Sequence, residues 1–280
     1  MKRYVTLVSV IAAVGGAVYA QGEIDLQQKV FYRNEWSIAL TLNSNGFGGN
    51  YRYGKHVNAR TKNLFEVDLA YMKSSKDYKT YSPTTSGAKF VYGKKNLAFD
   101  WRVSLGRQYE MFRKQDVGSV AIRYFYNYGP AVVMLKPVYY NIGDGYYDPS
   151  LQLTYIIERE QPERFDPDWV NQNISILSRA SFFKGFDRLS FVPGLFGKFG
   201  LNVEYSKQDR VVHALECGII AEGFIKKIEI MDFSQPPASQ AKTAKNQQFF
   251  LTLFVSYRFG RIVDPYEVKK ERKRSKEISY

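Results

Sequence analysis

The chain has 280 residues, of which 45% are hydrophobic, 16% aromatic and 24% charged, and its formal net charge is +13. This composition excludes wholesale disorder, and the length suffices for one large all-β domain or two small domains. One cysteine excludes a disulfide framework and a cysteine-built zinc site, and two histidines leave little for a histidine-rich metal site. The positive charge indicates an acidic partner, either nucleic acid or an anionic membrane surface.

The N-terminus has the layout of a secretory signal peptide. Lys2 and Arg3 precede an apolar run over residues 5–14, and small residues over 17–20 precede a predicted cleavage point at Gln21. The run is too short to anchor the chain in a bilayer, and export argues against nucleic acid as the partner. No later stretch approaches the roughly 18 apolar residues of a spanning helix, which excludes a polytopic helical membrane protein.

Apolar and polar residues alternate with period two along most of the remaining chain. The pattern is clearest over residues 36–42, 65–71 and 97–105. Side chains alternate across a strand, so each segment predicts a strand with one apolar and one polar face. Segments bounded by turn residues predict further strands over 46–54, 86–93, 117–128, 131–141, 149–160, 174–183, 190–205, 210–222 and 247–260. Together they predict about twelve antiparallel strands, with ten or fourteen as alternatives.

Two all-β architectures fit this alternation, a water-soluble sandwich and a closed transmembrane barrel. The predicted strands are long enough to match a tilted transmembrane strand of about 9–11 residues. Aromatic residues cluster at strand ends, as at 124–128, 139–140 and 182–183, where interfacial girdles would place them. The last strand, 249–260, also ends in aromatic residues. The sequence therefore predicts an all-β fold, a closed antiparallel transmembrane β-barrel.

With its signal peptide, its alternating Tyr/Phe-rich strands and its ending over 257–260, the chain resembles the small outer-membrane β-barrel proteins of the Bacteroidota. The runs 123–126, 135–140 and 182–186 are similar to segments of this largely uncharacterised group. The resemblance implies a bacterial outer-membrane protein that is porin-like or an accessory barrel of secretion and assembly machines. These motifs are architectural and identify no reaction.

The predicted organisation is a signal peptide over 1–20, an N-terminal periplasmic segment over 21–34, a barrel over 35–262 and a basic periplasmic tail over 263–280. An even number of strands and a periplasmic N-terminus predict that the C-terminus is periplasmic too. The basic residues of the tail are Lys269, Lys270, Arg272, Lys273, Arg274 and Lys276. We hypothesise that they contact an acidic periplasmic partner, a lipid headgroup or the cell wall, and a solvated terminus is the alternative.

Charged residues on the polar strand faces are candidates for a charge network in the barrel lumen. They are Glu66, Asp68, Asp100, Arg102, Arg123 and Glu204. Such residues commonly fill a barrel by pairing, and a pore lining is the alternative. Neither His56 nor His213 has a carboxylate at a known catalytic spacing, and no serine occupies a nucleophile elbow. The sequence therefore predicts no catalytic residue, metal site or cofactor.

These inferences together predict a non-enzymatic outer-membrane barrel that serves as a structural or accessory component of an assembly or secretion complex. Its expected partners are outer-membrane lipid and other outer-membrane or periplasmic proteins, and not nucleic acid. A porin-like channel for small solutes is the alternative, and a lipid- or peptide-hydrolysing barrel is the third hypothesis. Large paired side chains inside the barrel would indicate a plug, whereas a continuous wet lumen would indicate a channel.

Overall fold

The structure, a computed structural model, describes residues 34–263 of the chain, with gaps at 59, 75–76, 78, 83–87, 114–118, 151–152, 171, 173, 207–210 and 233–245. The predicted signal peptide lies outside the described residues, and so do all but the edge residues of the two predicted periplasmic segments. Within the described residues, no helix is long and apolar enough to cross a membrane.

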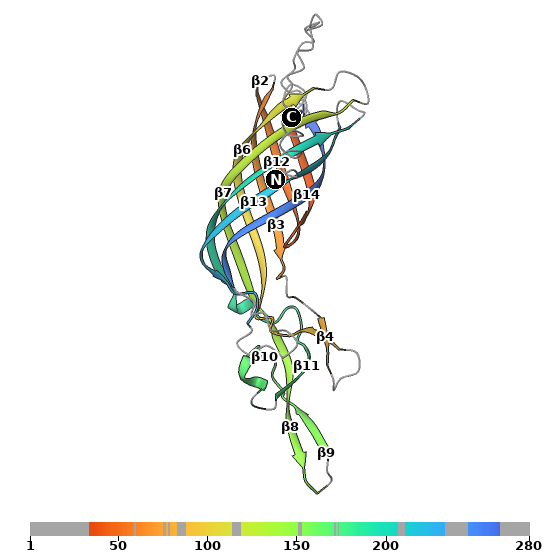
Figure 1. Cartoon of the computed structure of the whole chain (residues 1–280), viewed down its shortest axis with the longest axis vertical. Coiled ribbons are helices and arrows are strands. Elements are labelled where there is room, and N and C mark those ends of the chain that lie inside the picture. Colours follow the sequence, from red (N-terminus) through yellow and green to blue (C-terminus); the bar gives the residue numbers. More distant parts are fainter. Residues whose placement is uncertain are drawn as a thin grey trace, which may run out of the picture. The chain divides into compact units, whose positions relative to one another are not determined.

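Eight antiparallel strands pair in a closed ring (Figure 1). In chain order they are β1 (Asn34–Asn43), β2 (Gly46–Asn58), β3 (Thr61–Met72), β6 (Asn96–Phe112), β7 (Ala121–Pro137), β12 (Ser190–Glu204), β13 (Val211–Ile228) and β14 (Gln247–Val263). Each strand pairs with the ring strands before and after it in the chain, and β14 closes the ring on β1 through a continuous antiparallel ladder. The predicted all-β barrel fold is confirmed.

The predicted number of barrel strands is wrong, because the ring has eight strands and not ten, twelve or fourteen. The segments predicted over 117–128 and 131–141 share one uninterrupted strand, β7. Those predicted over 86–93, 149–160 and 174–183 do contain strands, but these strands pair outside the ring. Period-two alternation identifies a strand without identifying its partner, so it cannot separate ring strands from strands in the connections.

Two long connections between ring strands carry the additional strands, and we call residues 73–95 and 138–189 the loop module. The first connection contains β4 (Lys79–Tyr81) paired with β5 (Lys89–Val91). The elements of the second are β8 (Tyr139–Asp148), β9 (Leu153–Glu158), β10 (Glu163–Arg164), the short 3-10 helix η1 (Pro167–Val170), β11 (Ile174–Arg179) and the 3-10 helix η2 (Phe186–Arg188). Strand β8 is the centre of this sheet, since it pairs with β9, β10 and β11.

Buried aromatic side chains join the two connections of the loop module into one core. Tyr140 packs against Phe90, Phe165 and Trp169, with ring centroids 6.3 Å apart in each case. Its hydroxyl donates to the carbonyl oxygen of Val91 at 2.7 Å. Edge-to-face ring pairs of this kind add about 0.5–1.5 kcal/mol each beyond the area they bury. Because Phe90 and Val91 belong to the first connection, Tyr140 fixes one connection to the other.

The two ends of the ring carry different connections. The first end carries Asn34, Val263 and the short connections at 59–60, 113–120 and 205–210, and we call it the termini end. The opposite end carries the tight turn at 44–45, both connections of the loop module and the connection at 229–246, and we call it the loop end. Long connections are therefore confined to one end of the ring.

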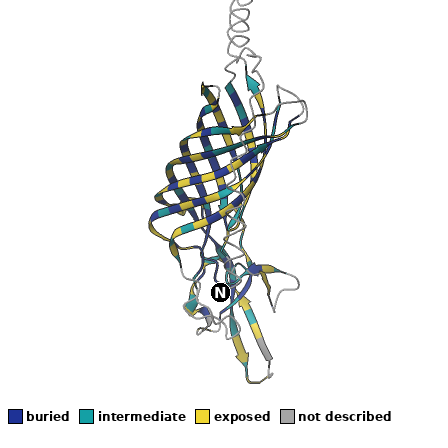
Figure 2. Ribbon diagram, turned by 45° about the horizontal axis from the view of Figure 1, so that its top comes forward, coloured by how far each residue is buried: buried dark blue, intermediate teal, exposed yellow. Residues whose placement is uncertain are grey.

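Exposed and buried residues alternate along every ring strand (Figure 2). On β14 the outward side chains are 40–74% exposed, namely Leu251, Leu253, Val255 and Tyr257. The side chains between them are buried, namely Thr252, Phe254, Ser256 and Arg258. The outer wall is thus apolar, and the ring encloses the charged residues. This is the reverse of a water-soluble sandwich, whose apolar face points inward, and it is the pattern of a barrel with lipid outside.

Aromatic side chains gather on the outer wall near both ends of the ring. At the termini end the Tyr109 ring stacks on that of Tyr124 with centroids 5.1 Å apart. At the loop end the Tyr71 ring packs between Phe47 and Phe99, with centroids 5.7 and 5.5 Å away. Aromatic rings favour the headgroup level of a bilayer, so these two groups occupy the positions of interfacial girdles.

Candidate functional site

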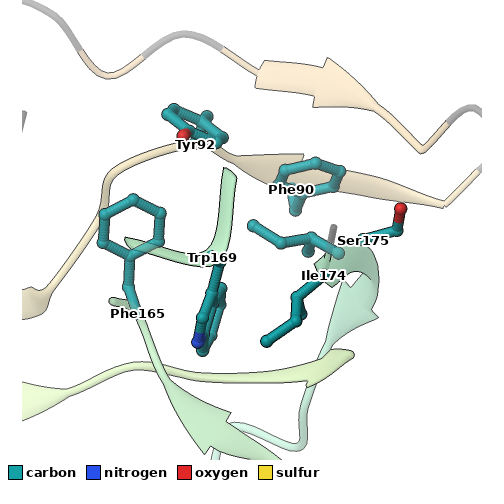
Figure 3. Close-up of a pocket in the computed structure, with 7 residues that line it drawn as sticks. Phe90, Tyr92, Phe165, Trp169, Ile174 and Ser175 are labelled. Atoms are coloured by element: carbon teal, nitrogen blue, oxygen red, sulfur yellow. The ribbon is translucent and has the colours of Figure 1, made fainter. Parts of the chain in front are cut away.

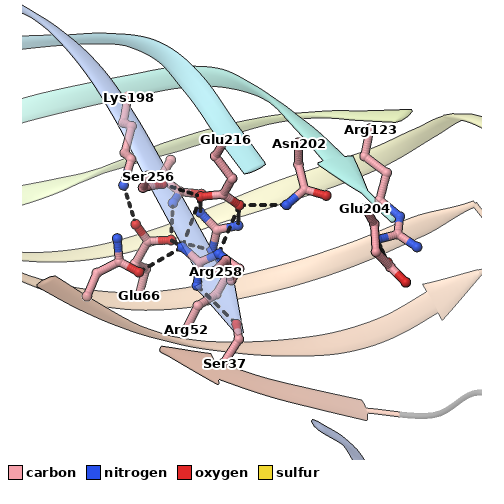
Figure 4. Close-up of polar contacts among 12 residues, drawn as sticks. Ser37, Arg52, Glu66, Arg123, Lys198, Asn202, Glu204, Glu216, Ser256 and Arg258 are labelled. Atoms are coloured by element: carbon pink, nitrogen blue, oxygen red, sulfur yellow. Dashed lines mark hydrogen bonds and ion pairs between the residues drawn. The ribbon is translucent and has the colours of Figure 1, made fainter. Parts of the chain in front are cut away.

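Five charged side chains from five ring strands meet inside the barrel, and we call them the central network (Figure 4). Arg52 on β2 donates to Glu66 on β3 and, at 2.6 Å, to Glu216 on β13. Arg258 on β14 donates to Glu216 at 2.9 Å, and Lys198 on β12 donates to Glu66. All five side chains are at most 2% exposed. Every charge in the network therefore has an opposite charge within hydrogen-bond distance.

Neutral polar side chains occupy further hydrogen-bonding positions of the central network. They are Ser37, which accepts from Arg258 at 3.0 Å, Asn50, which accepts from Arg258 at 2.7 Å, and three that donate to network carboxylates, Asn127, Asn202 and Ser256. Buried charges are costly unless they are both paired and hydrogen-bonded, and removing one partner of a buried pair typically costs about 3–5 kcal/mol.

A second group of charges lies beside the central network. Arg102 on β6 lies 3.3 Å from the carboxylate of Asp100 and 3.0 Å from that of Glu222 on β13. Asp68 on β3 accepts from Lys198 at 3.2 Å and so connects this group to the central network. The charged layer therefore extends across the interior from β3 and β6 to β12 and β13.

A third group of charges lies near the termini end of the interior. Lys62 donates to Glu35 at 2.5 Å, and Arg123 donates to Glu204. The hydroxyl of Ser206 also donates to Glu204, at 2.9 Å. These pairs form a further layer of paired charges between the central network and the termini end.

Rings and aliphatic side chains fill the rest of the interior. Three interior cations lie over buried rings. Arg52 is 4.4 Å from the Phe125 centroid, Lys198 is 4.9 Å from that of Phe254, and Arg102 is 5.7 Å from that of Phe196. Toward the loop end the buried cluster includes Met72, Val133, Leu135, Val192, Phe196, Ile220, Phe224, Ile228 and Met231. An eight-stranded ring is just wide enough for side chains to fill it. The described interior is accordingly a packed core and not a water-filled lumen.

The six residues proposed from sequence fall into different groups of this interior. Glu66 belongs to the central network, and Asp68, Asp100 and Arg102 belong to the second group. Arg123 and Glu204 pair with each other near the termini end. The sequence reasoning missed further members of the interior, namely Glu35, Arg52, Lys62, Lys198, Glu216, Glu222 and Arg258. Their signal was present, since each is a charged residue at an inward position of an alternating strand.

The loop module contains an apolar pocket of about 110 Å³ (Figure 3). It is lined by Phe90, Tyr92, Phe165, Trp169, Ile174, Ser175 and Ile176. The ring centroid of Phe165 lies 5.2 Å from that of Tyr92 and 5.6 Å from that of Trp169, and this ring packing gives the pocket rigid walls. No charged side chain is among these lining residues, so the pocket suits a small, largely apolar group.

Ionic and buried phenolic groups also stabilise the loop module. The Arg159 guanidinium donates to both oxygens of Asp144, at 2.8 and 2.7 Å, and to Glu163 at 2.9 Å. These hydrogen bonds lower the pKa of Asp144 below its usual value. Burial raises the pKa of the Tyr140 phenol, which therefore stays protonated as the donor to Val91.

His213, which was considered as a catalytic candidate, lies on β13 among aromatic side chains. The Nδ1 atom of His213 is 3.1 Å from the Tyr257 hydroxyl, and its ring lies beside those of Tyr205 and Tyr257. In the part of the chain that the structure describes, no three His, Cys, Asp or Glu residues are grouped so as to hold a metal ion. Tyr257 and its neighbours are outward residues, which places His213 in the girdle of the termini end.

No protein-family model matches the chain, and neither does any curated protein. Among solved structures, it is similar to Neisserial surface protein A (NspA), with a TM-score of 0.40 and 9% identity over 82% of this chain and 96% of that one. It is also similar to Ail, the attachment invasion locus protein of Yersinia pestis, with a TM-score of 0.33 and 7% identity over 82% and 97% of the two chains. Ail was also solved in complex with the heparin analogue sucrose octasulfate. Likenesses at this level identify no function.

Proposed function

We propose that the chain is a non-enzymatic β-barrel of the bacterial outer membrane, of the kind that the Bacteroidota contain. Its role is that of a structural or accessory component of an assembly or secretion complex. Strands that cross a bilayer must pair every backbone group, and the closed eight-stranded ring meets this requirement. The apolar outer wall between two aromatic groups supports the same location, because lipid is the solvent that such a surface favours.

The observation that carries the proposed role is the central network. Arg52, Glu66, Lys198, Glu216 and Arg258 fill the middle of an eight-stranded ring and are at most 2% exposed. A solute that crossed the barrel would have to separate these buried pairs and move the rings beside them. The network therefore opposes the porin-like alternative and leaves the outer wall, the connections and the termini as the functional surfaces.

The unequal ends of the ring support one orientation. Outer-membrane barrels have short periplasmic turns and longer extracellular loops. By this rule the termini end faces the periplasm, and the loop module faces the outside of the cell. The basic tail, residues 269–276, lies outside the described residues and would extend from the termini end. We propose that it binds an acidic periplasmic partner through contacts that salt weakens over about 8 Å.

Recovery of partners from native membranes tests this role. The full chain and a chain lacking residues 265–280 are purified in mild detergent at low salt, and the proteins that accompany each are identified. We expect the full chain to bring down specific outer-membrane or periplasmic proteins, and the shortened chain to bring down less of an acidic periplasmic one. Equal recovery with both chains would contradict the role of the tail, and a lack of any specific partner would contradict the accessory role. Unchanged heat-dependent gel migration shows that the shortened barrel is folded.

A further inference from the structure

Three phenylalanine side chains stand exposed next to the loop end, and we call them the phenylalanine cluster. Phe182, Phe183 and Phe186 are 45%, 80% and 43% exposed, and their ring centroids lie 5.6–6.5 Å apart. Their segment includes η2, the short teal helix beside the ring in Figure 1. Grouped apolar side chains left exposed to this extent mark an interaction surface.

The phenylalanine cluster lies on the outer wall of the ring and not over its interior. On β7, Val133 and Leu135 point inward into the barrel core, so Lys136 points outward. Lys136 is nevertheless only 1% exposed, because its ammonium donates to the carbonyl oxygen of Lys184 at 2.9 Å and lies 4.8 and 5.0 Å from two rings of the cluster. The segment that carries the cluster therefore covers the outer face of β7.

A glycine holds this segment close to β7. Gly185 has a φ of 94°, in the left-handed region that favours glycine. A Cβ atom at this position would lie 2.9 Å from the carbonyl oxygen of Pro137 and 2.9 Å from the ring of Tyr139. A larger residue at position 185 would therefore clash with Pro137 and Tyr139. Gly185 allows the segment to lie close to β7, which places the cluster beside the outer wall.

The cluster continues the apolar outer wall beyond the ends of the strands. On the outward face of β12, Phe191 and Leu195 are 62% and 71% exposed, with the exposed Pro193 between them. Phe191 pairs in register with Met134 of β7, two residues before Lys136. In the orientation proposed above, the phenylalanine cluster and this part of the wall would lie together near the level where a bilayer's acyl chains meet its headgroups.

Cationic side chains surround the cluster with little negative charge to balance them. Lys184, Arg179 and Arg188 are all exposed, and Arg179 is near enough to Lys136 to repel its charge. Among these residues, the carboxylate of Asp187 lies 3.7 Å from Arg188. Aromatic rings can pack against acyl chains, and the neighbouring cations can bind phosphate. The surface is therefore complementary to a phosphorylated lipid.

We propose that the phenylalanine cluster, with Lys184 and Arg188, binds lipid A, the phosphorylated glycolipid of the outer leaflet. The rings insert among its acyl chains, and the two cations contact a phosphate. Arginine and lysine both bind phosphate oxygens, arginine through two parallel hydrogen bonds. The inference rests on the orientation proposed above, which places the loop end at the outer leaflet.

Binding of labelled lipids to the purified full chain in nanodiscs of phosphatidylcholine tests this proposal. The probes are diphosphoryl lipid A, the same lipid without its phosphates, and phosphatidylglycerol. The variants are Lys184→Gln with Arg188→Gln, and Phe182→Ser with Phe183→Ser. The matched control is Arg107→Gln with Arg261→Gln, which removes two exposed cations on the outer wall at the termini end.

We expect the cation variant to bind diphosphoryl lipid A more weakly by about fivefold for each basic residue removed, and the control to bind as the unaltered chain does. Loss of the phosphates from the lipid should weaken binding to the unaltered chain and leave the cation variant unchanged. The phenylalanine variant should weaken binding of both forms of lipid A. Equal binding by variant and control, or equal binding of phosphatidylglycerol and lipid A, would overturn the proposal. None of these outcomes bears on partner recovery, so the accessory role stands or fails separately.

Discussion

Arg52 and Glu216 lie 164 positions apart in the chain, yet Nη1 of the arginine is 2.6 Å from Oε1 of the glutamate inside the ring. Strands β1 and β14 separate their own strands in the ring order, so this contact spans the interior instead of joining neighbours. Neither charge has the other as partner until β14 closes on β1. This pair therefore depends on ring closure, which couples the pairing of the strands to the pairing of these two charges.

Removal of a cation from the central network should destabilise the folded barrel. Arg52→Gln leaves Glu66 and Glu216 buried with one fewer positive charge, and we expect a loss of about 3–5 kcal/mol in the free energy of unfolding. Lys55→Gln is the matched control, because Lys55 lies three residues further along β2 on the exposed face. Urea titration of the barrel in vesicles measures both. Equal stability of the two variants would show that the network contributes nothing.

A charge on the outer wall should hinder insertion into lipid. Ile219 lies near the middle of β13, is 44% exposed and pairs with two other outward apolar residues, Phe199 and Leu253. Ile219→Arg should cost about 2–4 kcal/mol near the bilayer midplane, whereas Ile219→Phe should be tolerated. Folding yield into vesicles, read from heat-dependent gel migration, distinguishes them. If both variants insert equally well, this face of β13 does not contact lipid.

The loop module should loosen without loss of the barrel when its core is opened. Trp169 is 5% exposed and packs on Tyr140 and Phe165, so Trp169→Ala should destabilise this core by about 3–5 kcal/mol. Tyr155→Ala is the control, because Tyr155 is 50% exposed on β9. We expect protease cleavage within 138–189 for the first variant only, with the ring strands uncut in both. Cleavage of the ring as well would show that module and barrel unfold together.

Much of the barrel could be predicted from sequence because its strands alternate so regularly. Over 65–71 the assignment of Leu69 to one face and Asp68 to the other follows from period two, and the structure has Leu69 at 41% and Asp68 at 3% exposed. Gly129 and Pro130 separate the strands predicted over 117–128 and 131–141, because glycine and proline are typical turn residues. In the structure they lie within β7, where the ladder to β6 passes from the Arg102–Ala131 pair to the Leu105–Tyr128 pair. Proline lacks an N–H, and this local interruption accommodates it.

The partners within the interior could not be predicted, because they depend on how the ring closes. Alternation places Arg52, Glu66 and Glu216 at inward positions, but their distances follow from strand number and stagger. With about twelve strands the interior would be wider, and these side chains would not meet in the same way. The loop module was missed for a related reason, since its strands alternate as ring strands do.

The link between Asp144 and Arg159 should resist acid. Hydrogen bonds from Arg159 lower the pKa of Asp144, so the stabilisation is complete above the ordinary carboxyl pKa of about 3.9 and is lost only as pH falls through the lowered value. Carboxyl titration followed by NMR should show a lower midpoint for Asp144 in the unaltered chain than in Arg159→Gln. Arg164→Gln, which removes a nearby exposed cation, should leave the midpoint in place. Identical midpoints in all three proteins would show that Arg159 does not lower the pKa of Asp144.

Conductance of the purified full chain in planar bilayers tests the central claim, that paired charges and packed rings fill the barrel. Heat-dependent gel migration of the same sample establishes that the recorded protein is folded, and an open porin recorded in parallel establishes that channels are detected. Because Arg52, Lys198 and Arg258 hold buried carboxylates across the interior, we predict no steady conductance. Large, stable, long-lived open channels from the folded barrel would contradict the account and make the porin-like function the better one.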